Sequence, residues 1–190
     1  MKGQQGNKIT SRIWLKAFMT TLRENENKID YSTDTKWTES MESIMKEVGA
    51  KLGCGVSCKD PKKEEGEEYL GIDFMFFYKK DYDEDRYVFP IVVVEHENSD
   101  REALVKYALW KILCVRSSVQ VLICYRNNKT KIEILRQHLE DVILQGNLMK
   151  ETDSELIVLI GDDSVDDEVA WEDYYSCFAW QNNKLKKIAY

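Results

Sequence analysis

Acidic side chains continue a stretch of sequence whose pattern predicts a buried strand. Residues 91–94 are four apolar residues in a row, which is typical of a strand covered on both faces, and they run directly into Glu95, His96 and Glu97. Alternate side chains of an extended chain share a face, so Glu95 and Glu97 point one way and His96 points the other. Carboxylates at the end of a buried strand are costly unless a positive group meets them. The pattern therefore predicts a charged partner at this place.

A third acid lies in the aromatic run at residues 69–78, which is predicted to be the preceding strand. The polar, acidic connection between the two runs is predicted to be the turn of a hairpin. If Asp73 pairs with Glu95, that turn is centred on Glu84, in the middle of the connection. In this register Asp73, Glu95 and Glu97 lie together at the end of the hairpin away from the turn. A slip of one residue would place Asp73 on the opposite face.

Three neighbouring carboxylates repel each other and raise their own pKa values. The usual resolution is a hard divalent cation with oxygen ligands, Mg²⁺ or Mn²⁺. A helix predicted from Arg101 begins a few residues after Glu97, so its positive N-terminal end lies near the acids. Such a place suits a phosphate group that bridges the metal and the helix, and it predicts metal-assisted phosphoryl chemistry.

The elements that position these acids follow from periodicity. Both faces of the predicted hairpin are apolar apart from the acids, so helices are expected on both faces of a mixed sheet in an α/β fold. We find no internal repeat or linker, so residues 1–190 are assigned to one domain. The predicted helices are at about 11–24, 34–52, 101–115 and 131–145, the predicted strands at 53–59, 69–78, 87–97, 119–125 and 156–160, and a closing hairpin is expected at 174–180 and 185–189.

Composition limits the class of protein. A chain of 190 residues, 43% hydrophobic and 32% charged, is expected to form one substantial core. The net charge of −7 argues mildly against a general nucleic-acid coating protein, although it leaves room for a small basic groove. The five cysteines are an odd number and are interpreted as reduced thiols. With no apolar leader and no run of membrane-spanning length, we expect a soluble cytoplasmic protein that does not bind a membrane.

The order of these elements resembles the PD-(D/E)xK nuclease superfamily. The matching features are a helix and a strand, then Gly71-Ile72-Asp73 on a second strand and Glu95-His96-Glu97 on a third, then a helix and a strand. The resemblance covers about residues 36–126. It implies a restriction-endonuclease-like αβββαβ core, here with an extra N-terminal helix and a C-terminal hairpin. It also implies that Asp73 and Glu95 bind Mg²⁺ or Mn²⁺ and that phosphodiester bonds are hydrolysed.

The sequence departs from the superfamily pattern at one catalytic position. The lysine of the motif falls on Glu97, although some restriction-type members carry glutamate there. Glu97 is therefore expected to act as a third metal ligand, and the role of the lysine falls to Lys106 in the next helix, as in relatives whose lysine has migrated. The family often adds a glutamate from the first core helix, for which Glu42 and Glu47 are the candidates.

Simpler interpretations stand beside these. Glu95 and Glu97 are also explained as the solvated end of a strand, and Lys106 as an ordinary surface lysine. His96 lies on the apolar opposite face and is interpreted as a hydrogen-bonded core residue rather than a base.

Three functional hypotheses follow. The first is a metal-dependent nuclease that acts on nucleic acid, DNA rather than RNA. The second is a catalytically inactive member of the same fold that serves as a binding or assembly module. The third is an unrelated α/β binding domain, which would be preferred if Asp73 and Glu95 lay on opposite faces. A chain of this size leaves little room for a recognition domain, so a homodimer or a partner protein is expected to supply recognition of the substrate.

Overall fold

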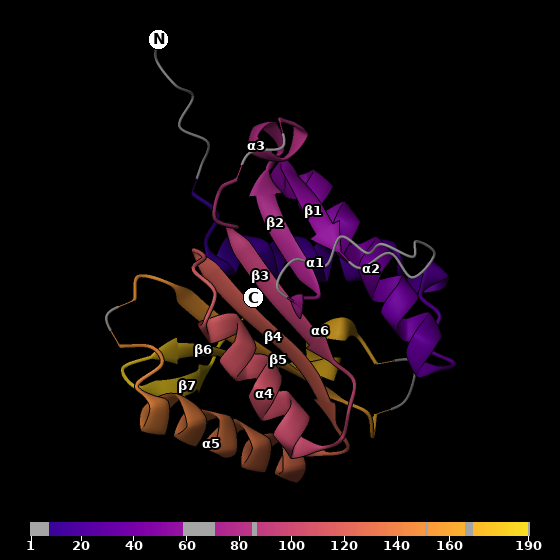
Figure 1. Ribbon diagram of the computed structural model, residues 1–190. Coiled ribbons are helices and arrows are strands. Elements are labelled where there is room, and N and C mark those ends of the chain that lie inside the picture. Colours follow the sequence, from indigo (N-terminus) through magenta and orange to yellow (C-terminus); the bar gives the residue numbers. More distant parts are fainter. Residues whose placement is uncertain (1–7, 59–70, 85–86, 151, 166–168, 190) are drawn as a thin grey trace.

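A single mixed sheet of seven strands forms the centre of the computed structural model (Figure 1). The structure describes residues 8–58, 71–84, 87–150, 152–165 and 169–189. The strands lie in chain order from β1 to β7. The first three are antiparallel, β3, β4 and β5 are parallel to each other, and β5, β6 and β7 are again antiparallel. The α/β class predicted from sequence is therefore confirmed.

The elements agree with the sequence periodicity over most of the described chain. The helices are α1 (Ser11–Glu24), the 3₁₀ helix η1 (Glu26–Lys28), α2 (Asp34–Leu52), α3 (Lys79–Asp83), α4 (Glu102–Leu113), α5 (Lys129–Gly146) and α6 (Trp171–Tyr174). The strands are β1 (Cys54–Cys58), β2 (Phe74–Tyr78), β3 (Val92–Glu97), β4 (Val119–Arg126), β5 (Glu155–Asp162), β6 (Tyr175–Gln181) and β7 (Lys184–Lys187).

Helices cover the two faces of the sheet in pairs, as the apolar hairpin predicted. Helices α1 and α2 pack on one face through a buried cluster that includes Trp14, Phe18 and Phe76. Helices α4 and α5 pack on the other face, around Leu109 and Leu122. Figure 1 shows α4 in front of the parallel strands and α1 and α2 behind the sheet. Inward residues of a single strand therefore belong to one of two separate cores.

Local sequence signals set the ends of α2. Thr33 lies before the helix with an extended backbone, and its hydroxyl accepts a hydrogen bond from the backbone N–H of Lys36. Gly53 ends the helix with a φ of 67°, a left-handed conformation that glycine adopts without steric cost. The predicted helix at 34–52 is confirmed at both ends because these capping residues are local signals.

The predicted register of the β2–β3 hairpin is confirmed. Phe74 pairs with Val94 and Phe76 pairs with Val92, which is the register that places Asp73 opposite Glu95. The strands are shorter than predicted, since Gly71 adopts a φ of 65° and β3 starts only at Val92. Residues 69–70 of the predicted strand lie outside the described residues.

The connection between β2 and β3 differs from the prediction, because it contains the short helix α3 rather than only a turn. The sequence of helix α4 is apolar around most of its circumference, yet Tyr107 is 57% exposed and Trp110 is 47% exposed. Their rings stack on each other with centroids 5.8 Å apart, so this outer face is apolar but solvent-exposed. An apolar sequence pattern shows which residues are apolar, but it does not show whether another element of the fold covers them.

The predicted C-terminal hairpin is confirmed. Strands β6 and β7 are joined by Asn182 and Asn183, whose φ angles are 53° and 61°. Two successive positive φ angles match the right-handed twist of a two-residue hairpin, and asparagine tolerates that conformation. The hairpin closes the sheet edge opposite β1.

Candidate functional site

Asp73 and Glu95 interlock at the end of the β2–β3 ladder. The backbone N–H of Asp73 donates to Oε1 of Glu95 over 3.2 Å. In return, Oδ2 of Asp73 accepts the backbone N–H of His96 over 2.8 Å. Each acid is thus held by the neighbouring strand, just beyond the last paired residues, Phe74 and Val94. The two carboxyl groups that the hairpin register predicted to be neighbours are brought together.

A lysine from helix α4 completes this group. The ammonium of Lys111 lies 2.8 Å from Oε2 of Glu95 and also donates to the backbone carbonyl of Gly71. The Lys111 side chain is 21% exposed and that of Glu95 is 5% exposed, so the pair lies at the boundary between core and solvent. We call Asp73, Glu95 and Lys111 the acid–lysine group. It joins the residue before β2, strand β3 and helix α4, which packs on this face of the sheet.

Burial sets the protonation of Glu95. Removal from water, and next the negative charge of Asp73, raise the pKa of Glu95 to about 8, against the opposing effect of Lys111. A carboxyl group with this pKa holds its proton over much of the neutral range and ionises readily when more positive charge arrives. While Glu95 is protonated, Lys111 balances the charge of Asp73, and only the loss of that proton leaves two negative charges beside one lysine.

Glu97 and Lys106 lie apart from this group. Oε1 of Glu97 accepts the backbone N–H of Ser99 over 2.8 Å, in the turn that follows β3. Lys106 pairs with Glu102 in its own helix, at 2.5 Å. The lysine that reaches the acids is Lys111, so the structure gives the position expected for Lys106 to a different residue of α4.

The glutamates of α2 do not reach the acid–lysine group. Glu47 accepts a hydrogen bond from the amide of Asn25 over 2.7 Å, and Glu42 pairs with Lys46. Both belong to the helix that covers the opposite face of the sheet, whereas Lys111 comes from α4. No glutamate of the first core helix therefore joins Asp73 and Glu95.

The donor set can be compared with what a divalent cation requires. No group of three or more His, Cys, Asp and Glu side chains in the described part of the chain is arranged to hold a metal ion. The expected three-acid cluster of Asp73, Glu95 and Glu97 is not formed as one group. Two adjacent carboxylates remain, and Mg²⁺ is commonly bound by one or two carboxylates together with water. Asp73 and Glu95 match that minimum in number, while both carboxylate oxygens of Glu95 already have protein partners.

His96 faces the other core, as the alternation along β3 predicted. Its Nε2 lies 2.7 Å from the hydroxyl of Tyr125, and its ring meets Trp37 edge to face. Burial lowers the pKa of His96 to about 3, so the imidazole is neutral in ordinary buffers. His96 is therefore a buried, hydrogen-bonded core residue on the face of the sheet away from Lys111.

Lys111 is the functional candidate that the sequence analysis missed. The signal that could have found it is the direction of α4, which runs back along the sheet between parallel strands β3 and β4. A helix that follows a strand and returns beside it brings its later residues next to the earlier part of that strand. Glu95 precedes the end of β3, so it meets a residue in the last turn of α4 rather than one in the first.

Comparisons with known proteins give no family. No protein-family model matches the chain, and no curated protein matches it either. Within the ranges that the structure describes, no helix is both long and apolar enough to cross a membrane.

Proposed function

We propose that this protein is a divalent-metal-dependent nuclease that hydrolyses phosphodiester bonds in DNA. The observation that carries the proposal is the acid–lysine group, in which Asp73 and Glu95 are interlocked across β2 and β3 with Lys111 beside them. Two carboxylates on adjoining parts of the sheet, with a lysine from α4 beside them, are residue types that suit metal-dependent phosphodiester hydrolysis.

The order of elements supports the same proposal. Apart from the short helix α3 between β2 and β3, the order of α2, β1, β2, β3, α4 and β4 is that of the αβββαβ core of the PD-(D/E)xK superfamily. Asp73 precedes the second strand of that series and Glu95 lies on the third. Lys111 takes the role of the motif lysine, which is absent from its usual place because Glu97 stands there. We propose this relationship on topology and residue types together.

Each residue has a defined task in this proposal. Asp73 and Glu95 would hold Mg²⁺ or Mn²⁺, and the bound ion would supply Lewis-acid polarisation of the phosphodiester and activation of water. Lys111 keeps Glu95 oriented and offers its ammonium protons to a phosphate oxygen or to the attacking water. Burial of Glu95 excludes bulk water from that side and strengthens the electrostatic contacts of the site.

A second candidate function is favoured by a specific observation. Both carboxylate oxygens of Glu95 already have partners, Oε1 with the N–H of Asp73 and Oε2 with Lys111. In a catalytically inactive binding module the acid–lysine group would be a permanent structural ion pair. Metal binding separates the two candidates, because only the nuclease needs Lys111 to share Glu95 with a cation.

The test is Mn²⁺ titration by calorimetry together with cleavage of plasmid DNA. Native protein is expected to bind Mn²⁺ and to cleave, and Asp73→Asn and Glu95→Gln each to lose both properties. Glu97→Gln is the matched control, since its carboxylate bonds to the Ser99 backbone, and it is expected to retain both. Absence of Mn²⁺ binding by the native protein would refute the nuclease and favour the binding module.

A further inference from the structure

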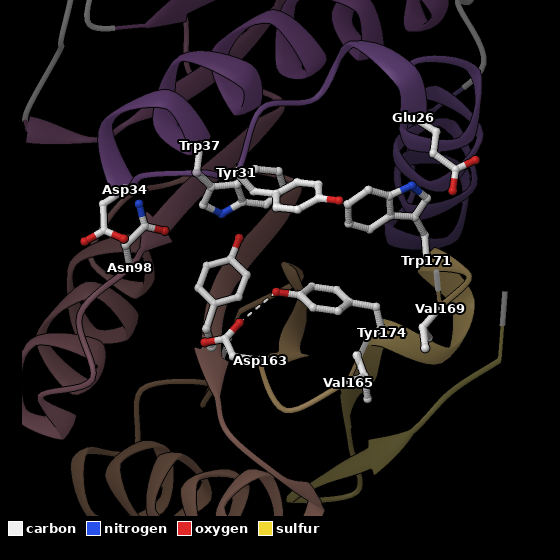
Figure 2. A pocket seen from close by; sticks show the side chains of 11 residues that line it. Glu26, Tyr31, Asp34, Trp37, Asn98, Asp163, Val165, Val169, Trp171 and Tyr174 are labelled. Carbon is white, nitrogen blue, oxygen red and sulfur yellow. Dashed lines mark hydrogen bonds between the residues drawn. The ribbon is translucent and has the colours of Figure 1, made fainter. Parts of the chain in front are cut away.

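A separate cavity of about 320 Å³ lies on the face of the sheet covered by α2. Aromatic side chains form much of its wall: Tyr31, Trp37, Tyr125, Trp171 and Tyr174. Figure 2 shows Trp37, Tyr31 and Trp171 along one side, with Asp163 and Tyr174 across from them. Its volume falls in the range of sites for small molecules. It lies on the opposite face from Lys111, so it is independent of the acid–lysine group.

Rings of this wall pack against one another, and Trp37 and Trp171 form a stacked pair. Trp37 and Trp171 are nearly parallel, with an interplanar angle of 5° and centroids 6.2 Å apart. Tyr125 meets Trp37 edge to face at 6.1 Å, and Tyr174 meets Trp171 in the same way at 5.6 Å. An aromatic wall suits a cation, because each ring carries a negative quadrupole on its face.

The charges on the wall have one sign. Glu26, Asp34 and Asp163 line the cavity, and its described lining contains no lysine, arginine or histidine. The hydroxyl of Tyr174 donates to Oδ1 of Asp163 over 2.8 Å, and partial removal from water raises the pKa of that acid. Negative groups at the wall favour a cation and repel a phosphate.

Arg126, on β4, follows the wall residue Tyr125 in sequence. Its side chain therefore leaves from the opposite face of the strand. Its guanidinium donates to the backbone carbonyls of Tyr125 and Ser99. Burial raises the pKa of Asp163 and outweighs the opposing positive charge of Arg126, and the described lining residues of the cavity include no basic side chain.

A buried hydrogen-bond chain holds one wall in place. The Tyr125 hydroxyl lies 2.7 Å from Nε2 of His96 and 3.3 Å from the hydroxyl of Tyr175. On the rim, Oδ1 of Asn98 is buried and has no hydrogen-bond partner among the described residues, while its amide donates to Thr38. A fixed wall lowers the ordering cost of binding, and an unmet acceptor suits a ligand that carries a hydroxyl or N–H group.

We propose that this cavity binds a small organic cation with an alkylated ammonium group, through its aromatic wall and the carboxylate of Asp163. The rings replace the weak hydration of such a cation, and the acids supply the countercharge. A nucleotide is disfavoured because its phosphates would meet the same acids.

The test uses choline as the probe and its neutral isostere 3,3-dimethylbutan-1-ol as the reference, by calorimetry on the full chain. The two molecules share shape and hydroxyl group and differ in charge. We expect choline to bind at least tenfold more tightly than the isostere. Equal affinities would show that the cavity selects apolar shape alone and would overturn the proposal, as would failure of choline to bind.

Matched variants locate the binding. Tyr31→Ala and Asp163→Asn alter exposed wall residues and are expected to weaken choline binding at least fivefold each. Tyr107→Ala and Asp141→Asn change the same exposed residue types on α4 and α5 and are expected to leave binding within twofold of native. If the wall variants bind choline as well as native protein does, the cation binds elsewhere and the assignment to this cavity is wrong. Tight binding of adenosine or cytidine, with none of choline, would overturn the proposal in favour of a base-binding cavity.

Discussion

The carboxylate of Glu95 and the ammonium of Lys111 lie 2.8 Å apart, although they come from β3 and from the last turn of α4. Glu95 is almost fully buried and Lys111 partly so. Glu95 is thus a buried acid with one lysine partner and one acidic neighbour, Asp73. The effect of its ionisation on the stability of the protein can be measured directly.

Replacement of Lys111 by methionine should destabilise the protein in a pH-dependent way. At pH 6 the cost should be small, because Glu95, with a pKa of about 8, keeps its proton there. At pH 9 the variant must bury an unpaired carboxylate or retain its proton, and we expect a loss of about 2 kcal/mol. Urea denaturation at both pH values measures the difference. Lys106→Met, which removes a pair within α4, is the control, and an equal loss at the two pH values would contradict the prediction.

Replacement of Glu95 by glutamine should make the folding stability of the protein less dependent on pH. The pKa of Glu95 is raised from 4.5 to about 8 on folding, so the folded state binds this proton more tightly. The stabilisation of the folded state by this tighter proton binding is fully present below pH 4.5 and is lost as the pH rises through 8. In EDTA-containing buffer the stability of Glu95→Gln relative to native protein should therefore increase from pH 5 to pH 9. A constant difference across that range would show that Glu95 ionises normally in the folded state.

The proposed catalytic role of Lys111 can be separated from metal binding. Lys111→Gln should retain Mn²⁺ binding and lose about 100-fold in the rate of plasmid cleavage, because a positioned proton donor is removed. Lys106→Gln should change the rate by less than twofold, since that side chain pairs with Glu102. Retention of full cleavage by Lys111→Gln would exclude a catalytic role for this lysine.

The His96–Tyr125 contact predicts a structural effect without pH dependence. Tyr125→Phe leaves the buried Nε2 of His96 without its partner, which should cost about 1–2 kcal/mol of folding free energy. Because the pKa of His96 is lowered to about 3, its imidazole NMR signals should not titrate between pH 5 and pH 8. A midpoint near pH 6.5 would mean that the ring is solvated, and the structural role would then be wrong.

Sequence alone determined the features that depend on neighbours along the chain. The apolar stripes and caps predicted α2 from Asp34 to Leu52, and a two-asparagine turn predicted the final hairpin. The position of the polar connection predicted the β2–β3 register, because a turn centred on that connection sets which residues of the two strands pair. Hence the contact between Asp73 and Glu95 was foreseeable.

Only the tertiary structure decided which residues meet from distant elements. A lysine was expected near the acids, but whether Lys106 or Lys111 arrives depends on how α4 lies against β3, which no local pattern encodes. In the turn after β3 the carboxylate of Glu97 accepts a hydrogen bond from the backbone N–H of Ser99. Glu97 therefore does not join Asp73 and Glu95. The aromatic cavity gathers residues from α2, β4 and α6 whose separation in sequence hides their shared surface. Packing geometry, rather than residue type, determined which of these distant residues come into contact.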